Sequence, residues 1–97
     1  MEFRKGILFI RLKGDLNKDT IKGIIDKDFK YVVLNIDDMY SIDSYSIKYL
    51  NKIYRLYENN NKKFIICDKF NVSRKLLRDI PKINREYDAF ELFERMI

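Results

Sequence analysis

Apolar residues gather in three short runs that predict β-strands. Residues 7–12 (ILFIRL) and 64–67 (FIIC) are almost continuously apolar, and residues 31–36 (YVVLNI) are β-branched and bounded by charges. Such runs are typical of strands buried on both faces, as in a parallel sheet. Residues 1–5 and 82–85 are expected to add two short strands at the margins.

Between the first three runs, apolar residues recur at helical spacing. Asn17 stands at the N-cap position of a short helix. Its apolar residues are Ile21, Ile24 and Ile25. A polar stretch, residues 37–43, then leads to a longer helix that begins near Ser44 and is stopped by Asn59, Asn60 and Asn61. One face of this longer helix is apolar: Ile47, Leu50, Ile53, Tyr54 and Tyr57.

Two further helices are predicted after the third run. The first follows a cap at Asn71 or Ser73 and is halted by Pro81. Its apolar residues are Val72, Leu76, Leu77 and Ile80. The second starts near Asp88 and carries Phe90, Phe93 and Ile97. Strands that alternate with helices indicate an α/β domain with parallel strand pairs and right-handed crossovers. Residues 1–97 form a single domain, because no linker or internal repeat divides them.

The composition excludes several kinds of chemistry. The chain has no histidine, three glycines and one cysteine, Cys67. These counts exclude a disulfide framework, His-based catalysis and His-containing zinc sites, and there is no phosphate-loop motif. Cys67 ends an apolar strand and is interpreted as a core residue. Asp37 and Asp38, with Asp43, are interpreted as a solvated turn rather than a magnesium site. We therefore expect neither enzyme activity nor a cofactor.

Charge and hydropathy suggest where the domain works. No apolar run approaches the roughly 18 residues of a membrane span, so a cytoplasmic protein is expected. Basic residues outnumber acidic ones by 20 to 15, for a net charge of +5. Residues 62–85 hold eight basic residues against two acidic ones. This stretch is interpreted as a solvated face or as a site for an acidic partner. Nucleic acid ranks third, since aromatic and basic residues do not interleave.

Three motifs carry a resemblance to a known family. Residues 42–46 read Ile-Asp-Ser-Tyr-Ser after a buried strand, residues 14–17 read Gly-Asp-Leu-Asn before the first helix, and residues 64–67 end a strand on Cys. In this order and spacing, from about residue 6 to 94, the chain resembles the STAS domain of bacterial anti-sigma factor antagonists. The resemblance implies an α/β fold with a small mixed sheet of four or five strands and helices largely on one face.

The resemblance also implies a function and a site. The unphosphorylated form would bind an anti-sigma factor, usually a serine kinase, and so release the sigma factor for transcription. That kinase would then phosphorylate Ser44 and a phosphatase would reset it, with ATP and magnesium belonging to the kinase. A helix start favours an anion, and phosphorylation adds about −1.5 to −2 charge there. The implied partner-binding residues are Asp15, Asn17, Asp43, Ser44, Tyr45, Ser46 and Lys48.

Two positions depart from the family pattern and keep alternatives open. Tyr45 stands where the family has a small residue, and Ser46 stands where it has glycine. Without the resemblance, Ser44 would be interpreted as a helix cap. Tyr45 is interpreted as a half-exposed interface anchor. The alternative functions are a non-phosphorylated STAS scaffold or transporter-associated subunit, and, from another class, a small basic nucleic-acid binder.

Overall fold

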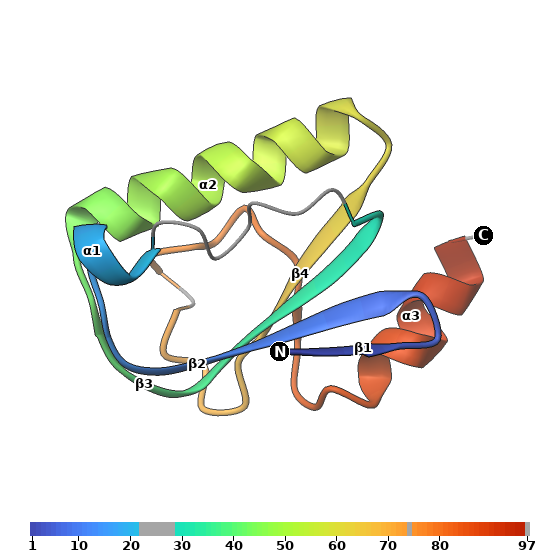
Figure 1. Ribbon diagram of the computed structural model, residues 1–97, viewed down its shortest axis with the longest axis horizontal. Helices are drawn as coiled ribbons and strands as arrows, with labels where there is room; N and C mark the ends of the chain where they lie inside the picture. The colour runs from blue at the N-terminus through green and yellow to red at the C-terminus, as the bar shows by residue number, and fades with distance from the viewer. Residues whose placement is uncertain (22–28, 74, 97) are drawn as a thin grey trace.

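One sheet of five strands, in the order β1–β2–β3–β4–β5, organises the residues that the computed structural model describes, which are 1–21, 29–73 and 75–96 (Figure 1). The elements are β1 (Glu2–Arg4), β2 (Ile7–Leu16), α1 (Lys18–Ile21), β3 (Tyr31–Ile42), α2 (Ser44–Asn59), β4 (Lys63–Cys67), β5 (Lys82–Ile83) and α3 (Asp88–Met96). β1 pairs with β2 antiparallel, and the other neighbouring pairs are parallel. The predicted mixed α/β sheet is therefore confirmed.

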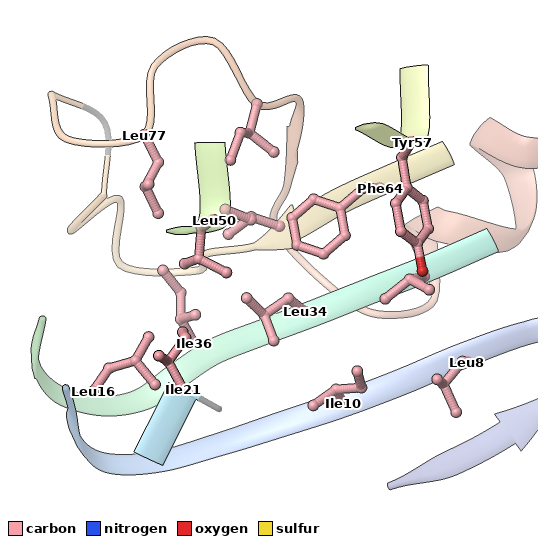
Figure 2. Close-up of a cluster of buried hydrophobic side chains, with 13 residues drawn as sticks. Leu8, Ile10, Leu16, Ile21, Leu34, Ile36, Leu50, Tyr57, Phe64 and Leu77 are labelled. Carbon is pink, nitrogen blue, oxygen red and sulfur yellow. The ribbon is translucent and has the colours of Figure 1, made fainter. Parts of the chain in front are cut away.

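The three apolar runs form the centre of the sheet, as predicted, and both of its faces are covered. On one face, α2 packs over Leu34, Phe64 and their neighbours through Leu50 and Tyr57 (Figure 2). On the other face, the buried residues of the sheet pack against α3. That second cluster comprises Ile7, Phe9, Val33, Ile65, Cys67, Ala89 and Phe93. Helices α1 and α2 thus share one face, while α3 alone covers the other.

β2 and β3 continue past their predicted ends, so the expected polar loop at residues 37–43 is wrong. β2 runs to Leu16 and β3 to Ile42, and the two remain paired, with register shifts between Arg11 and Lys13 and between Gly14 and Asp15. Gly14 has φ +74°, a conformation that suits glycine at a bulge. The polar residues fit because side chains alternate between the covered and the exposed side of a strand.

The helix predicted over residues 72–80 is wrong. The described part of this segment forms turns that connect β4 to β5. Leu77 and Ile80 are buried in the core beneath α2, but Val72 and Leu76 are exposed. A helix would have carried all four residues on one face, whereas the turns separate them into two pairs.

The remaining predicted elements are present with shifted ends. Asn17 caps α1, while Ile24 and Ile25 lie outside the described residues. α2 begins at Ser44 and ends at Asn59, as predicted, and α3 begins at Asp88. β5 is shorter than the predicted strand at 82–85. No helix among the described residues is both long and apolar enough to cross a membrane.

Candidate functional site

The carboxyl ends of β2 and β3 bring together two of the sequence motifs, residues 14–17 and residues 42–46. In the parallel pair, Leu16 is opposite Ile42, and the N–H of Asp43 donates to the carbonyl of Leu16 at 3.0 Å. One step earlier, the Ser41 hydroxyl donates to Asp15 Oδ1 at 2.7 Å. Parallel strands end at the same edge of a sheet, so residues nearly thirty positions apart in the chain become neighbours here. Asp15 therefore braces the strand that leads into α2.

Asn17 closes the turn between β2 and α1 with reciprocal hydrogen bonds. Its Oδ1 accepts the N–H groups of Asp19 at 3.0 Å and Thr20 at 3.2 Å. In return, the Thr20 hydroxyl accepts the N–H of Asn17 at 2.8 Å and donates to the carbonyl of Asp15 at 3.0 Å. This is the logic of a capping box, with threonine in the returning position. The turn is thereby fixed beside the first turn of α2 (Figure 1).

Asp43, rather than Ser44, is the N-cap of α2. Its backbone is extended, and its Oδ1 accepts the N–H of Ser46 at 2.8 Å. This hydrogen bond favours the charged carboxylate, so the pKa of Asp43 is lowered from its ordinary value. The interpretation of Ser44 as a cap is therefore wrong. Because Asp43 already caps the helix, the Ser44 hydroxyl is not needed for that role.

Ser44 is the first residue of α2, and its side chain is exposed. Its hydroxyl makes no hydrogen bond to any other residue that the structure describes. The helix start supplies N–H groups and the positive end of the helix dipole. An anion attached to Ser44 would therefore sit in a favourable field, one turn before the exposed Lys48.

Tyr45 opens a shallow surface pocket along α2. The ring is 43 % exposed, and Lys18 Nζ of α1 lies 5.9 Å from its centre, within the range of a cation–π contact. The pocket has a volume of about 240 Å³ and is lined by Tyr45, Lys48, Tyr49 and Lys52. Tyrosine is enriched at protein interfaces, whereas lysine is depleted there, so the rings of this pocket are its interface-like feature. The half-exposed ring agrees with the prediction, and its role as an anchor stays a prediction.

Ser46 lies apart from the rest of the proposed surface. Its side chain is fully buried, and within the described residues its hydroxyl has no hydrogen-bond partner. Its backbone N–H serves the Asp43 cap. Ser46 therefore contributes to the frame of the site and not to the exposed surface, in contrast to Asp15, Asp43, Ser44, Tyr45 and Lys48.

No protein-family model matches the chain, and no curated protein sequence matches it. The solved structure of the anti-sigma factor antagonist SpoIIAA in its unphosphorylated form does match, with a TM-score of 0.78 over 100 % of this chain and 96 % of that one. The sequence identity is 17 %, so the shared property is the fold. The chain has the STAS fold.

Two other sequence candidates have structural roles within this STAS fold. Cys67 is fully buried, and burial raises the pKa of its thiol to about 12, so it stays protonated in the core. Asp37 accepts the N–H of Lys69 at 2.7 Å, while Asp43 caps α2. The aspartates once considered together as a magnesium site therefore serve different segments.

Sequence reasoning missed Lys18, Thr20 and Ser41, which are also part of the candidate site. Each hydrogen-bonds or contacts a residue that was predicted. Thr20 was detectable, because it stands three residues after the N-cap Asn17, at a capping-box position. Ser41 could not be found without the register of β2 and β3. The sequence does not reveal this register, because the polar residues at this end of β3 are typical of a loop.

Proposed function

We propose that this chain is a regulatory protein of the anti-sigma factor antagonist type, switched by phosphorylation of Ser44. The observation that carries the proposal is the exposed hydroxyl of Ser44 at the first position of α2, which makes no hydrogen bond to another described residue. The partner is a protein that acts both as an anti-sigma factor and as the serine kinase for this site. The STAS fold supports this class of function and not the identity of the partner.

The unphosphorylated protein binds its partner through the surface around the start of α2. Asp15 and Asn17 hold the neighbouring turn, and Tyr45 and Lys48 offer an aromatic ring and a cation. Because hydrogen bonds within the chain already fix Asp15 and the turn at Asn17, binding costs little ordering of this part of the surface. Release of the sigma factor follows from occupying the anti-sigma factor.

Phosphorylation changes the charge of this surface without requiring a new fold. The phosphate adds about −1.5 to −2 charge directly beside the Asp43 carboxylate. A partner packed against the helix start would have to accept and desolvate both groups, so its affinity falls. Lys48, one turn later, compensates part of the charge within the chain. A phosphatase restores the binding form, and kinase, phosphatase and this protein meet in the cytoplasm, where ATP is present.

An intact-mass spectrum of the protein from its native cells tests the switch. We expect a phosphate-sized increase in mass that is lost in Ser44→Ala and kept in Ser46→Ala, the matched control whose serine is buried. In addition, Ser44→Glu should weaken co-purification of the partner relative to Ser44→Ala. If no phosphate appears during growth or stress, the phosphoswitch is wrong.

A second candidate function is a STAS scaffold that is not phosphorylated, such as a subunit docked on a membrane transporter. The observation that favours it is Tyr45, whose exposed ring beside Ser44 enlarges the surface that a kinase must accommodate. This function predicts no phosphate and co-purification with a transport ATPase. In that case Tyr45→Ala should reduce co-purification, whereas Ser44→Ala should not.

A further inference from the structure

The connection between β4 and β5 exposes an unusual amount of apolar surface. Phe70 is 65 % exposed, Val72 54 % and Leu76 46 %. All three lie within residues 69–78 (KFNVSRKLLR), which we name the basic connection because it holds four basic residues and no acidic one. Apolar side chains that gather on a short exposed segment mark interaction sites more often than singly scattered ones do.

The first half of the basic connection is held in place by two carboxylates. The buried Asp68 accepts the N–H of Val72 at 3.0 Å, and its Oδ2 accepts both the N–H and the hydroxyl of Ser73, at 2.8 and 2.6 Å. Asp37 of β3 accepts the N–H of Lys69 at 2.7 Å. These bonds fix the turn that carries Phe70 outward.

The second half is held by the core. Leu77 and Ile80 are buried beneath α2, and Leu77 lies beside Leu50 (Figure 2). Lys82 Nζ donates to the carbonyls of Leu77 and of Ile80, the latter at 2.9 Å. The exposure of Leu76 is therefore imposed by a well-anchored backbone. Such a preordered apolar surface loses little entropy when it binds.

The cations of the basic connection are available to a partner. Lys69, Lys75 and Arg78 are exposed, and none forms an ion pair with another residue in the described part of the chain. Lys69 Nζ lies 5.6 Å from the centre of the Phe70 ring, so a cation and an apolar anchor are presented together. The carboxylate of Asp68 is already engaged and does not neutralise them.

We propose that the basic connection is a docking surface for an acidic segment of a partner protein, one that carries apolar side chains among its carboxylates. The carboxylates pair with Lys69, Lys75 and Arg78, and the apolar side chains cover Phe70, Val72 and Leu76. This docking does not depend on Ser44. It also explains the excess of basic residues in this part of the chain as a recognition feature.

A protein segment fits this surface better than a lipid membrane does. Asp38 is exposed on β3 beside Asp37, the residue that anchors Lys69, and Asp79 is exposed at the end of the basic connection. A flat anionic bilayer would meet these carboxylates together with the cations. A protein segment can place its acidic groups against the cations alone.

The surface is also within reach of the candidate site. Asp37 precedes Asp43 by six residues along β3 and the cap that follows it, a distance of about 20 Å in an extended chain. A partner with a standard interface of about 800 Å² can cover both places.

Photo-crosslinking in extracts of the native cells tests the proposal. The full chain carries a benzoylphenylalanine in place of Phe70, or in place of Tyr87 as the control, which is 72 % exposed and precedes α3. We expect an adduct at position 70 that is absent at 87 and whose linked peptide has an excess of Asp and Glu. The absence of an adduct above the control, or a linked peptide without that excess, overturns the proposal.

Charge reversal shows whether the cations of the basic connection are needed for the adduct to form. Lys69→Glu combined with Lys75→Glu should reduce the adduct about tenfold, because like charges then face each other. Lys30→Glu, an exposed lysine just before β3, should leave it unchanged. All of these side chains are exposed, so thermal unfolding should change little, and that measurement checks the fold. Equal loss of adduct in Lys30→Glu contradicts the proposal.

Two further measurements separate this proposal from its rivals. Sedimentation with vesicles of phosphatidylcholine and phosphatidylglycerol should leave the protein in the supernatant, and Phe70-dependent binding to the vesicles would overturn docking to a protein. The adduct should also form with Ser44→Ala, which carries no phosphate. A failed phosphoswitch together with a persistent adduct would therefore remove the proposed function and keep this one.

Discussion

At the scale of single residues, two buried serines make opposite contributions to stability. Ser46 and Ser73 are both almost fully buried, but within the described part of the chain only the Ser73 hydroxyl is hydrogen-bonded, donating to Asp68 at 2.6 Å. A buried hydroxyl without a partner loses its hydration and gains nothing in return, whereas a hydrogen bond to a carboxylate stabilises. The two serines therefore form a matched pair.

We expect Ser46→Ala to raise the free energy of unfolding by roughly 0.5–1 kcal/mol, since alanine also has the better helix propensity. Ser73→Ala should lower it by roughly 1–3 kcal/mol, because Asp68 loses a donor. Urea unfolding at neutral pH measures both changes. Equal destabilisation by the two substitutions would show that the Ser46 hydroxyl has a partner after all.

The residue scale is also where the sequence predicted the start of α2 most accurately. Asp43 and Ser44 were recognised from a short motif because both the cap and the exposed hydroxyl are local properties of a helix start. Which of the two residues acts as the cap was not predictable, since Ser and Asp are both good N-caps. The burial of Ser46 depends on what packs above α2, and no local pattern reveals it.

At the scale of elements, the basic connection shows that helical spacing of apolar residues does not by itself produce a helix. Val72, Leu76, Leu77 and Ile80 have helical spacing, which predicted a helix. In the structure, Leu77 and Ile80 are buried in the core beneath α2, whereas Val72 and Leu76 are exposed. The hydrogen bonds of Asp68 and Lys82 involve N–H groups and carbonyls that a helix over these residues would also leave unpaired, so burial of the two core residues decides the conformation.

Adjacent leucines in this segment test its packing. Leu77 is fully buried, whereas Leu76 is 46 % exposed. Leu77→Ala should lower the free energy of unfolding by about 2–5 kcal/mol, because it leaves a cavity beneath α2. Leu76→Ala should cost well under about 1 kcal/mol, as expected for a largely exposed position. Thermal or urea unfolding of the two variants compares them directly, and similar losses would contradict the turn conformation.

For β2 and β3, the sequence predicted the buried parts of the strands but not their ends. Residues 7–12 and 31–36 were recognised because their centres, residues 7–10 and 32–34, are buried on both faces and therefore continuously apolar. Their extensions to Leu16 and Ile42 were missed, because there the sheet is covered on one side only and the polar residues look like a loop. The extensions form the edge that holds Asp15 beside Ser41, so the sequence named the site residues without their contacts.

At the scale of the whole molecule, Glu86 connects the segment before α3, the helix on the second face of the sheet, to the strands. It lies between β5 and α3, and its carboxylate accepts hydrogen bonds from Arg11 of β2 at 2.8 and 2.6 Å and from Asn35 of β3 at 2.7 Å. Arg11 also pairs with Glu2 of β1 at 3.0 Å. Three strands and the segment leading into α3 thus meet at one carboxylate.

This junction predicts a pH dependence of stability. The hydrogen bonds from Arg11 lower the pKa of Glu86 from its ordinary value. A carboxyl whose folded pKa is depressed stabilises the fold above its unfolded pKa, about 4.3, and loses that contribution as the pH falls through the folded pKa. Glu86→Gln should therefore lower the free energy of unfolding at pH 7, by up to about 1 kcal/mol because the group is only partly buried.

The difference between the wild type and Glu86→Gln should shrink as the pH falls from 7 to about 3, because the wild-type carboxyl becomes neutral as well. Glu91→Gln is the matched control, since among the described residues Glu91 pairs only with Arg95, one turn later on the exposed side of α3. Its effect should be about 0.5 kcal/mol or less. Urea unfolding at several pH values measures all three proteins. If the free energies of unfolding of the wild type and Glu86→Gln differ by the same amount at every pH, the charge of Glu86 does not contribute to joining α3 to the sheet. Packing and uncharged hydrogen bonds of this side chain would then account for the difference.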